Sequence, residues 1–436
     1  DGFIDNQGNF GADGIVGPHH EKEGSFYTIK QLWSPVQIMN TSIDKQFDGK
    51  FSVENRYDYL NLNTCRFLWK QVKFPTATDT SNTTTQVLKE GEVQGSDVAA
   101  HSTGILDIKT TILPNADALF LTAIDKYGHE LWRWTFPVDK LNQTNEVFSP
   151  LSGKATYSET ENELTVKAKN HTFIFSKRDG QLKGVSVNNH KISFANGPRF
   201  IGARRADRSL DQFYNHDDEK AKEKDRTYSE FPDAAVFTKL EVKEDGGNLI
   251  VTANYKLGNL DKAQWTINPN GEAALDYTYN FSGVVDLIGI SFDYPEDQVI
   301  SKRWLGAGPY RVWQNRIHGT QYDVWENDYN DPIPGETFTY PEFKGYFDSV
   351  SWMNIRTKEG TISLTNETPD SYIGVYQPRD GRDRLLYTLP ESGISVLDVI
   401  PPVRNKVNST DLCGPSSQPK WVNGPQTGRI IFRFME

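Results

Sequence analysis

The feature that most limits the fold of this chain is a long series of short β-type segments after Thr156. Segments such as LTVKAKN, HTFIFSK and LIVTANYKL alternate apolar and polar residues or are rich in β-branched and aromatic ones. Turn-forming residues separate them, which is the pattern of strands in a sheet. Roughly 280 residues of this kind exceed what one simple sandwich holds. We therefore predict a large assembly of two packed sheets.

A second, shorter group of strand-like segments precedes this region. Residues 41–140 contain FSVENRYDYL, CRFLWKQV, ALFLTAIDK and ELWRWTFPV, with polar runs between them. Short strands at this spacing predict a small β-sandwich of about 100 residues. The polar segment 141–155 contains Pro and Gly and is predicted to be a linker to residues 156–436.

The first 40 residues follow a helical pattern. Glu23–Trp33 places Phe26, Ile29 and Trp33 three and four residues apart, which predicts one amphipathic helix. Pro35 ends it, because the residue before a proline avoids the α conformation. A helix this short is not a domain, so we expect its apolar stripe to belong to a larger structure.

Charge and cysteine content argue against several kinds of partner. The chain has 47 Lys and Arg against 58 Asp and Glu, a formal net charge of -11. So acidic a chain repels nucleic acid and anionic membrane, and neither is an expected partner. No apolar run approaches the roughly 20 residues that cross a bilayer. Cys65 and Cys413 form neither a disulfide framework nor a zinc-binding spacing.

The most distinctive local sequence is Trp304–Arg316, WLGAGPYRVWQNR. It contains three aromatic residues, two arginines and a Gly-x-Gly-Pro turn. An aromatic ring can stack on the C–H face of a sugar, and guanidinium or amide groups can bind its hydroxyls. Arg311 and Trp313 are therefore candidate carbohydrate-binding residues. The alternative interpretation is that the tryptophans belong to the core and the arginines are solvated.

This stretch resembles the W-x-G-x-GP-x-E-x-Y-x-DR signature of the small-chain domain of family 2 β-galactosidases. Tyr340–Trp352, YPEFKGYFDSVSW, aligns without gaps with a second motif of that domain. The framework glycines, prolines and aromatics match, whereas several polar residues of the family are replaced. The departures are at Val312, Asn315, Phe343, Lys344 and Phe347. The resemblance implies the same fold, with an altered sugar preference or no sugar contact at this place.

Residues 9–38 are similar to the segment that ends the catalytic (β/α)8 barrel of the same family. In the family, the phenylalanine of this segment touches the galactosyl site and its carbonyl binds a monovalent cation. A residue three positions later supplies a side-chain oxygen to that ion. Carried over, the resemblance implies a carbohydrate contact at Phe10 and cation ligands at Phe10 and Asp13, and oxygen ligands suit a hard cation. It implies no cofactor in this chain alone, and Na⁺, K⁺ or Mg²⁺ in the complete enzyme.

The segment Leu412–Val422, LCGPSSQPKWV, matches a loop that in the family offers a tryptophan to the leaving sugar. A gap-free match places Gln418 at the tryptophan position, and Trp421 follows three residues later. Both are candidate carbohydrate-binding residues.

The resemblance implies a mainly β chain in three parts. They are a barrel remnant at 1–40, an immunoglobulin-like β-sandwich at 41–140 and, after the linker 141–155, a galactose-mutarotase-like β-supersandwich at 156–436. A retaining glycosidase needs two carboxyl groups, and no segment here resembles those that carry them in the family. We therefore expect no catalytic residue in this chain. The implied function is the non-catalytic C-terminal part of a β-galactosidase-like glycoside hydrolase, supporting the barrel and shaping the leaving-group subsite.

Two alternative functions stay open. A stand-alone carbohydrate-binding module would present tryptophans as a platform, and the candidates are Trp304, Trp313, Trp352 and Trp421. An aldose epimerase would need a general base and a general acid, typically Glu and His. The histidines after the linker lie in no segment that resembles an epimerase motif.

The expected partners are a β-galactoside or plant polysaccharide and the missing catalytic barrel. An exposed stripe on the N-terminal helix would favour a homo-oligomer. The chain opens at Asp1 without a signal peptide, which leaves localisation open. A periplasmic or secreted location is slightly favoured over a cytoplasmic one.

Overall fold

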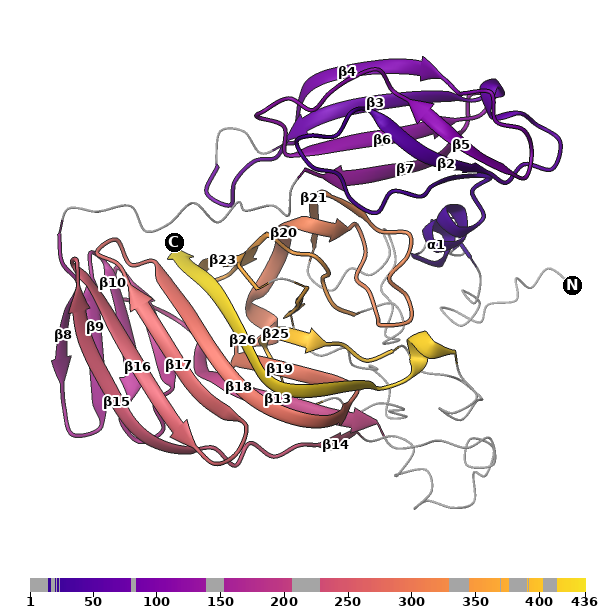
Figure 1. Ribbon diagram of the computed structural model, residues 1–436. Helices are drawn as coiled ribbons and strands as arrows, with labels where there is room; N and C mark the ends of the chain where they lie inside the picture. The colour runs from indigo at the N-terminus through magenta and orange to yellow at the C-terminus, as the bar shows by residue number, and fades with distance from the viewer. Residues whose placement is uncertain are drawn as a thin grey trace, which may run out of the picture.

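The predicted fold class is confirmed in a computed structural model of the chain, which is mainly β (Figure 1). The structure describes residues 15, 16, 20, 22, 24–79, 84–138, 153–205, 228–328, 345–368, 370–375, 390, 392–402 and 414–436. Within these ranges the strands form four sheets whose ladders are antiparallel, preceded by the helix α1 (Gly24–Leu32). No helix in the described part combines the length and apolar character needed to cross a membrane.

A small sandwich forms first. Its strands are β1 (Val36–Ile38), β2 (Lys50–Asn55), β3 (Arg66–Lys73), β4 (Gln86–Gln94), β5 (Ser102–Asp107), β6 (Ala118–Ile124) and β7 (Glu130–Pro137). They make one sheet of order β1-β2-β5 and one of order β4-β3-β6-β7. Alternating side chains of both sheets meet inside, as where the ring centroids of Phe51 and Phe136 lie 5.0 Å apart. The strand β1 falls within the predicted barrel remnant, yet it pairs with β2. The chain therefore enters the small sandwich directly after α1.

A large sandwich of two sheets follows. One sheet contains β8 (Thr156–Glu159), β9 (Glu163–Ala168), β10 (His171–Ser176), β11 (Leu182–Val187), β12 (His190–Ile192), β13 (Ala195–Arg205), β14 (Tyr228–Glu230), β19 (Leu287–Asp293), β24 (Tyr372–Val375) and β25 (Ile394–Val399). The other contains β15 (Val236–Asp245), β16 (Asn248–Lys256), β17 (Leu260–Ile267), β18 (Ala273–Val285), β20 (Val299–Gly308), β21 (Gln321–Asp328), β22 (Trp352–Thr357), β23 (Gly360–Asn366) and β26 (Lys420–Met435). Short 3₁₀ turns lie at Leu62–Thr64, Glu296–Gln298 and Pro415–Ser417.

Aromatic side chains from both large sheets fill the space between them. Phe292 on β19 lies 4.6 Å from Phe194 and 5.5 Å from Phe432 on β26, measured between ring centroids. Trp265 on β17 packs edge-on against Phe292. Each ring removes a large apolar surface from water, so this cluster dominates the core that joins the two sheets.

The small and large sandwiches share a buried joint, which we call the inter-sandwich joint. It contains Phe74 and Phe120 of the small sandwich and Leu305 and Trp352 of the large one. The Trp352 indole Nε1 donates to the carbonyl oxygen of Pro75 at 3.1 Å. An ion pair of 3.1 Å between Arg133 and Asp323 and a bond from Asn354 to the carbonyl of Ala77 border it. Apolar contact and polar bonds thus fix one sandwich against the other.

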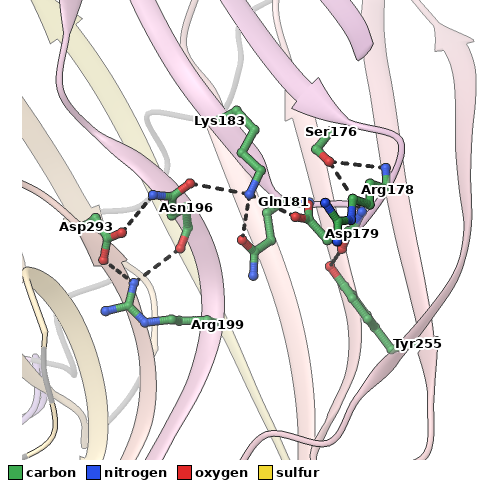
Figure 2. Close-up of polar contacts among 9 residues, drawn as sticks. All are labelled: Ser176, Arg178, Asp179, Gln181, Lys183, Asn196, Arg199, Tyr255 and Asp293. Atoms are coloured by element: carbon green, nitrogen blue, oxygen red, sulfur yellow. Dashed lines mark hydrogen bonds and ion pairs between the residues drawn. The ribbon is translucent and has the colours of Figure 1, made fainter. Parts of the chain in front are cut away.

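A polar network covers an irregular stretch of β13 (Figure 2). The pairing of β13 with β19 shifts register between Ala195 and Arg199. Across this shift, Arg199 forms an ion pair with Asp293 and donates to the carbonyl of Asn196, whose side chain also donates to Asp293. Lys183 on β11 reaches the same Asn196. The network replaces ladder bonds that the irregular backbone does not make.

Replacing Arg199 with methionine is expected to lower the free energy of unfolding by about 1 kcal/mol, because the pair is only partly exposed and carries extra hydrogen bonds. Arg66→Met is the matched control, since Arg66 pairs across strands with Glu92 at an exposed site. We expect the control to cost less than about 0.5 kcal/mol in urea denaturation. Equal losses in the two variants would mean that the network adds nothing to an ordinary surface pair.

Candidate carbohydrate-facing site

The signature stretch begins as a buried strand. Trp304 on β20 is enclosed, with its Nε1 donating to the carbonyl of Ala307 at 3.0 Å. Its ring packs edge-on against Phe347 at 4.9 Å. Phe347, one of the departures from the family's polar residues, therefore serves the core. Phe343 and Lys344 lie outside the described residues.

Arg311 and Trp313, the two sugar contacts predicted from this stretch, are both buried. Trp313 is 3% exposed and packs edge-on against Tyr346, in a cluster with Ile201 and Leu397. The loop after β20 folds onto the outer face of the sheet that contains β13 and β25, and this packing covers the indole. Neither side chain offers a ligand an open face, so neither is carried into the proposed site. The alternative interpretation had placed the arginines in solvent, and the burial of Arg311 differs from that as well.

Trp421 has the opposite placement. It is the second residue of β26, pairs with Val284 on β18, and its side chain is 69% exposed. Of the four tryptophans considered as a platform, Trp304, Trp313 and Trp352 are core residues and Trp421 stands at the surface. Gln418 ends the preceding 3₁₀ turn and is half-buried. An exposed indole on a strand is the kind of surface on which a sugar ring stacks.

Two amide side chains hold the segment that leads to this indole, residues 414–420, which we call the Trp421 turn. Gln314 Nε2 donates to the carbonyl oxygens of Ser416 at 2.9 Å and Gln418 at 2.7 Å. Asn315 Nδ2 reaches the hydroxyl of Ser417 at 3.2 Å. Gln314 is absent from the residues predicted from the sequence. The signal that could have found it is an amide placed directly after a buried tryptophan.

Helix α1 packs against the loop that supplies these amides. The rings of Tyr27 and Tyr310 stack at 5.8 Å, and Thr28 Oγ1 donates to the carbonyl of His318 at 2.7 Å. The amide of Gly319 donates to Gln31 Oε1 at 2.5 Å. Burial raises the pKa of Tyr310 far above its ordinary value, so its hydroxyl stays neutral. This hydroxyl also donates to the backbone carbonyl of His318.

The face of α1 that makes these contacts differs from the predicted apolar stripe. Gly24, Tyr27 and Gln31 lie on the side that meets the loop. Phe26 and Ile29 are only partly buried, and the side chain of Trp33 is 78% exposed. The helix therefore has a second apolar face that the described residues do not cover.

A partly buried acid, Asp348, lies near the start of β26. Asp348 accepts from the Ser349 hydroxyl at 3.1 Å, and its backbone carbonyl accepts from the Ala307 amide at 3.0 Å. Burial raises the pKa of the Asp348 carboxyl, against the lowering effect of the Ser349 hydrogen bonds and the Lys420 charge. Burial together with the neighbouring acids also raises the pKa of Tyr372 to about 12.

The predicted cation ligands, Phe10 and Asp13, lie outside the described residues. Within the ranges that the structure describes, no group of three or more His, Cys, Asp or Glu side chains is placed to hold a metal ion. The cation site stays a prediction.

Of the histidines weighed for epimerase chemistry, His171 and His318 take part in packing and His190 lies at the surface. A ring nitrogen of His171 lies 2.8 Å from the carbonyl oxygen of Phe434, and His190 is exposed near Glu436. His318 contributes its backbone carbonyl to the packing of α1. His216 lies outside the described residues.

Comparison with known proteins gives this architecture a family. The model of the β-galactosidase small chain matches residues 167–389, about half of the chain. A β-galactosidase of Priestia megaterium (strain DSM 319 / IMG 1521) is 22% identical over 388 residues, which cover 84% of this chain and 35% of that protein. The chain thus spans about a third of the length of this curated relative.

Solved structures give weaker likenesses. A mutarotase candidate, YeaD from Salmonella typhimurium, shares 9% identity and covers 67% of this chain and 99% of its own, with a TM-score of 0.29. The protein HI1317 shares 8% identity and covers 64% of this chain and 98% of its own, also with a TM-score of 0.29. TM-scores this low do not establish a shared fold.

The two large sheets, closed by the long C-terminal strand β26, define a β-sandwich domain. The extent of the family match makes the assignment specific. This chain belongs to the β-galactosidase small-chain family.

Proposed function

We propose that this chain is the non-catalytic C-terminal part of a family 2 β-galactosidase-like glycoside hydrolase. In that role it supports the catalytic barrel and supplies a wall of the leaving-group sugar subsite. The observation that carries the proposal is the exposure of Trp421, because the other three candidate tryptophans are core residues. The activity of the complete enzyme toward β-galactosides or plant polysaccharides belongs to the same proposal.

The N-terminal helix is consistent with a role in supporting the catalytic barrel. One face of α1 is bound to the loop after β20, while Trp33 on another face is open to solvent. An exposed tryptophan next to partly buried Phe26 and Ile29 suits contact with a further protein surface. We assign that surface to the catalytic barrel.

Isothermal calorimetry of the chain against galactose, lactose and plant oligosaccharides tests the sugar subsite. A single stacking tryptophan predicts weak binding, with Kd on the order of 1 mM. Trp421→Ala is expected to abolish this binding. Tyr127→Ala is the matched control, because Tyr127 is an equally open aromatic residue on the β6–β7 turn of the small sandwich. Binding that survives Trp421→Ala, or that is lost equally in both variants, would overturn the assignment of Trp421.

The same samples test the non-catalytic role. We expect no hydrolysis of a nitrophenyl β-galactoside by the chain alone, since the two carboxyl groups of a retaining glycosidase are assigned to the barrel. Turnover that persists in highly purified chain would contradict this assignment.

A further inference from the structure

The indole of Trp421 stands where its strand is least supported. Along β26, residues 430–432 pair with both β18 and β23 and residues 433–435 pair with β23, whereas among the described strands residues 420–429 pair with β18 alone. The pairing of Trp421 with Val284 is the last but one of that ladder, which ends at Lys420. Terminal pairs of a ladder fray readily, because few contacts hold them. The position of the indole therefore depends on what anchors the Trp421 turn.

Gln314, which is 7% exposed, bonds the turn twice, and Asn315 adds the bond to Ser417. The two amide hydrogens of Gln314 go to two carbonyl oxygens of the turn, those of Ser416 and Gln418. Its own backbone amide donates to the carbonyl of Pro401 at 3.0 Å, which fixes the base of the side chain. Because water is largely excluded, a lost bond here is not replaced by solvent.

The loop that carries Gln314 is bonded to α1 on its other side. Tyr310, His318 and Gly319 contact the helix through Tyr27, Thr28 and Gln31, as described above. Figure 1 shows α1 and the short yellow turn before β26 on the same side of the molecule, with the chain that follows β20 between them. Residues 310–319 thus connect the helix with the Trp421 turn.

We propose that Gln314 is a positioning residue for Trp421, and that its two hydrogen bonds set where the indole stands relative to α1. The consequence for sugar affinity rests on the proposed function, whereas the positioning itself does not. In this role Gln314 does not contact the sugar and acts only through the Trp421 turn.

Gln314→Glu provides a test with a built-in switch. As a carboxylate, the new side chain has no hydrogen to donate and faces two carbonyl oxygens, so the turn is released. Once protonated it regains one O–H donor. Burial raises the pKa of such a carboxyl by up to several units, which brings the switch to between about pH 6 and about pH 8. Gln314→Met is the matched variant, because it removes both donors and does not titrate.

The readout is fluorine NMR of the chain labelled with 5-fluorotryptophan, with the Trp421 resonance assigned by its loss in Trp421→Phe. In Gln314→Glu we expect this resonance to be displaced at about pH 8 and to return toward its wild-type position at about pH 6. In Gln314→Met it should be displaced at both values. The Trp33 and Trp304 resonances report an exposed and a buried site elsewhere, and both should stay unchanged if the fold is intact.

Calorimetry with galactose and lactose separates the two proposals. At about pH 8 we expect Gln314→Glu to bind about tenfold more weakly than the wild type, because the indole is then displaced from its sugar-stacking position. An unchanged Trp421 resonance in both variants would overturn the positioning role. A displaced resonance with sugar affinity that depends on neither Gln314 nor Trp421 would uphold the positioning role and overturn the sugar subsite.

Discussion

Replacing Trp352 with alanine is expected to lower the free energy of unfolding by about 3–5 kcal/mol. The indole is 2% exposed and lies in the inter-sandwich joint between Leu305 and the small-sandwich residues Phe74 and Phe120. Its removal leaves a cavity and deprives the Pro75 carbonyl of its donor. We also expect thermal unfolding to change from one transition to two, because the joint is what couples the sandwiches.

Trp421→Ala is the control for this experiment. It deletes the same side chain from an exposed position, and we expect it to shift stability by less than about 0.5 kcal/mol. Differential scanning calorimetry measures both the total loss and the number of transitions. A single unshifted transition in Trp352→Ala would show that the joint contributes little to the stability of the chain.

The second large effect is expected at a pair between the two large sheets, formed by the buried Tyr279 and the partly buried Asp398. Tyr279 on β18 donates its hydroxyl to the carboxyl of Asp398 on β25. Burial raises the pKa of Asp398, although the hydrogen bond from Tyr279 opposes the rise. Burial and the same carboxyl raise the pKa of Tyr279, which stays neutral. Tyr279→Phe therefore leaves a partly buried carboxyl without this donor, at a cost of about 2 kcal/mol near neutral pH.

The loss in Tyr279→Phe should depend on pH in a defined direction. A carboxyl whose folded pKa is raised binds more protons in the folded than in the unfolded state. Its contribution to stability is therefore present at low pH and is lost as pH rises from the ordinary pKa of Asp through the raised one. Without the Tyr279 hydroxyl the folded pKa of Asp398 rises further. The deficit relative to the wild type should thus be small in acid and should grow as pH increases.

Tyr255→Phe is the matched control for the hydroxyl deletion. The Tyr255 hydroxyl donates to the backbone carbonyl of Asp179 at 2.9 Å, and a carbonyl does not titrate. We expect a loss of about 1 kcal/mol that is the same at every pH tested by urea denaturation. In Tyr279→Phe combined with Asp398→Asn the pH dependence should disappear. Parallel pH curves for Tyr279→Phe and the wild type would contradict the buried-carboxyl account.

Strands were predictable where one face of a segment is buried between two sheets. β2 and β3 alternate buried and more exposed side chains, whereas β6 and β7 are rich in apolar and aromatic residues. All four coincide with segments expected from the sequence. β4, with the sequence QVLKEGEVQ, is absent from that prediction. It is an edge strand of its sheet and is mostly exposed to solvent, which allows charged residues on both faces. These charged residues hide the apolar–polar alternation that would indicate a strand.

The C-terminal strand shows the same dependence within one element. Residues 430–435 are apolar except for Arg433 and were expected from RIIFRFM, and at residues 430–432 β26 lies between β18 and β23. Among the described strands, residues 420–429 pair with β18 alone, and they are largely polar. Their membership of the strand follows from the long partner β18 and not from their own pattern.

By itself the sequence determined the β class, the two groups of strands, the helix before Pro35 and the family resemblance, because these depend on periodicity and motifs along the chain. It also drew attention to Trp313 and Trp421 alike, since both are tryptophans in suggestive local sequences. Only the tertiary structure separated them. Trp313 is buried because its loop folds back onto a sheet, whereas Trp421 is exposed on the part of β26 that pairs with β18. The physical reason is that exposure is set by which distant segments pack over a side chain. The same packing, between residues 314 and 418, made Gln314 an anchor of the exposed indole.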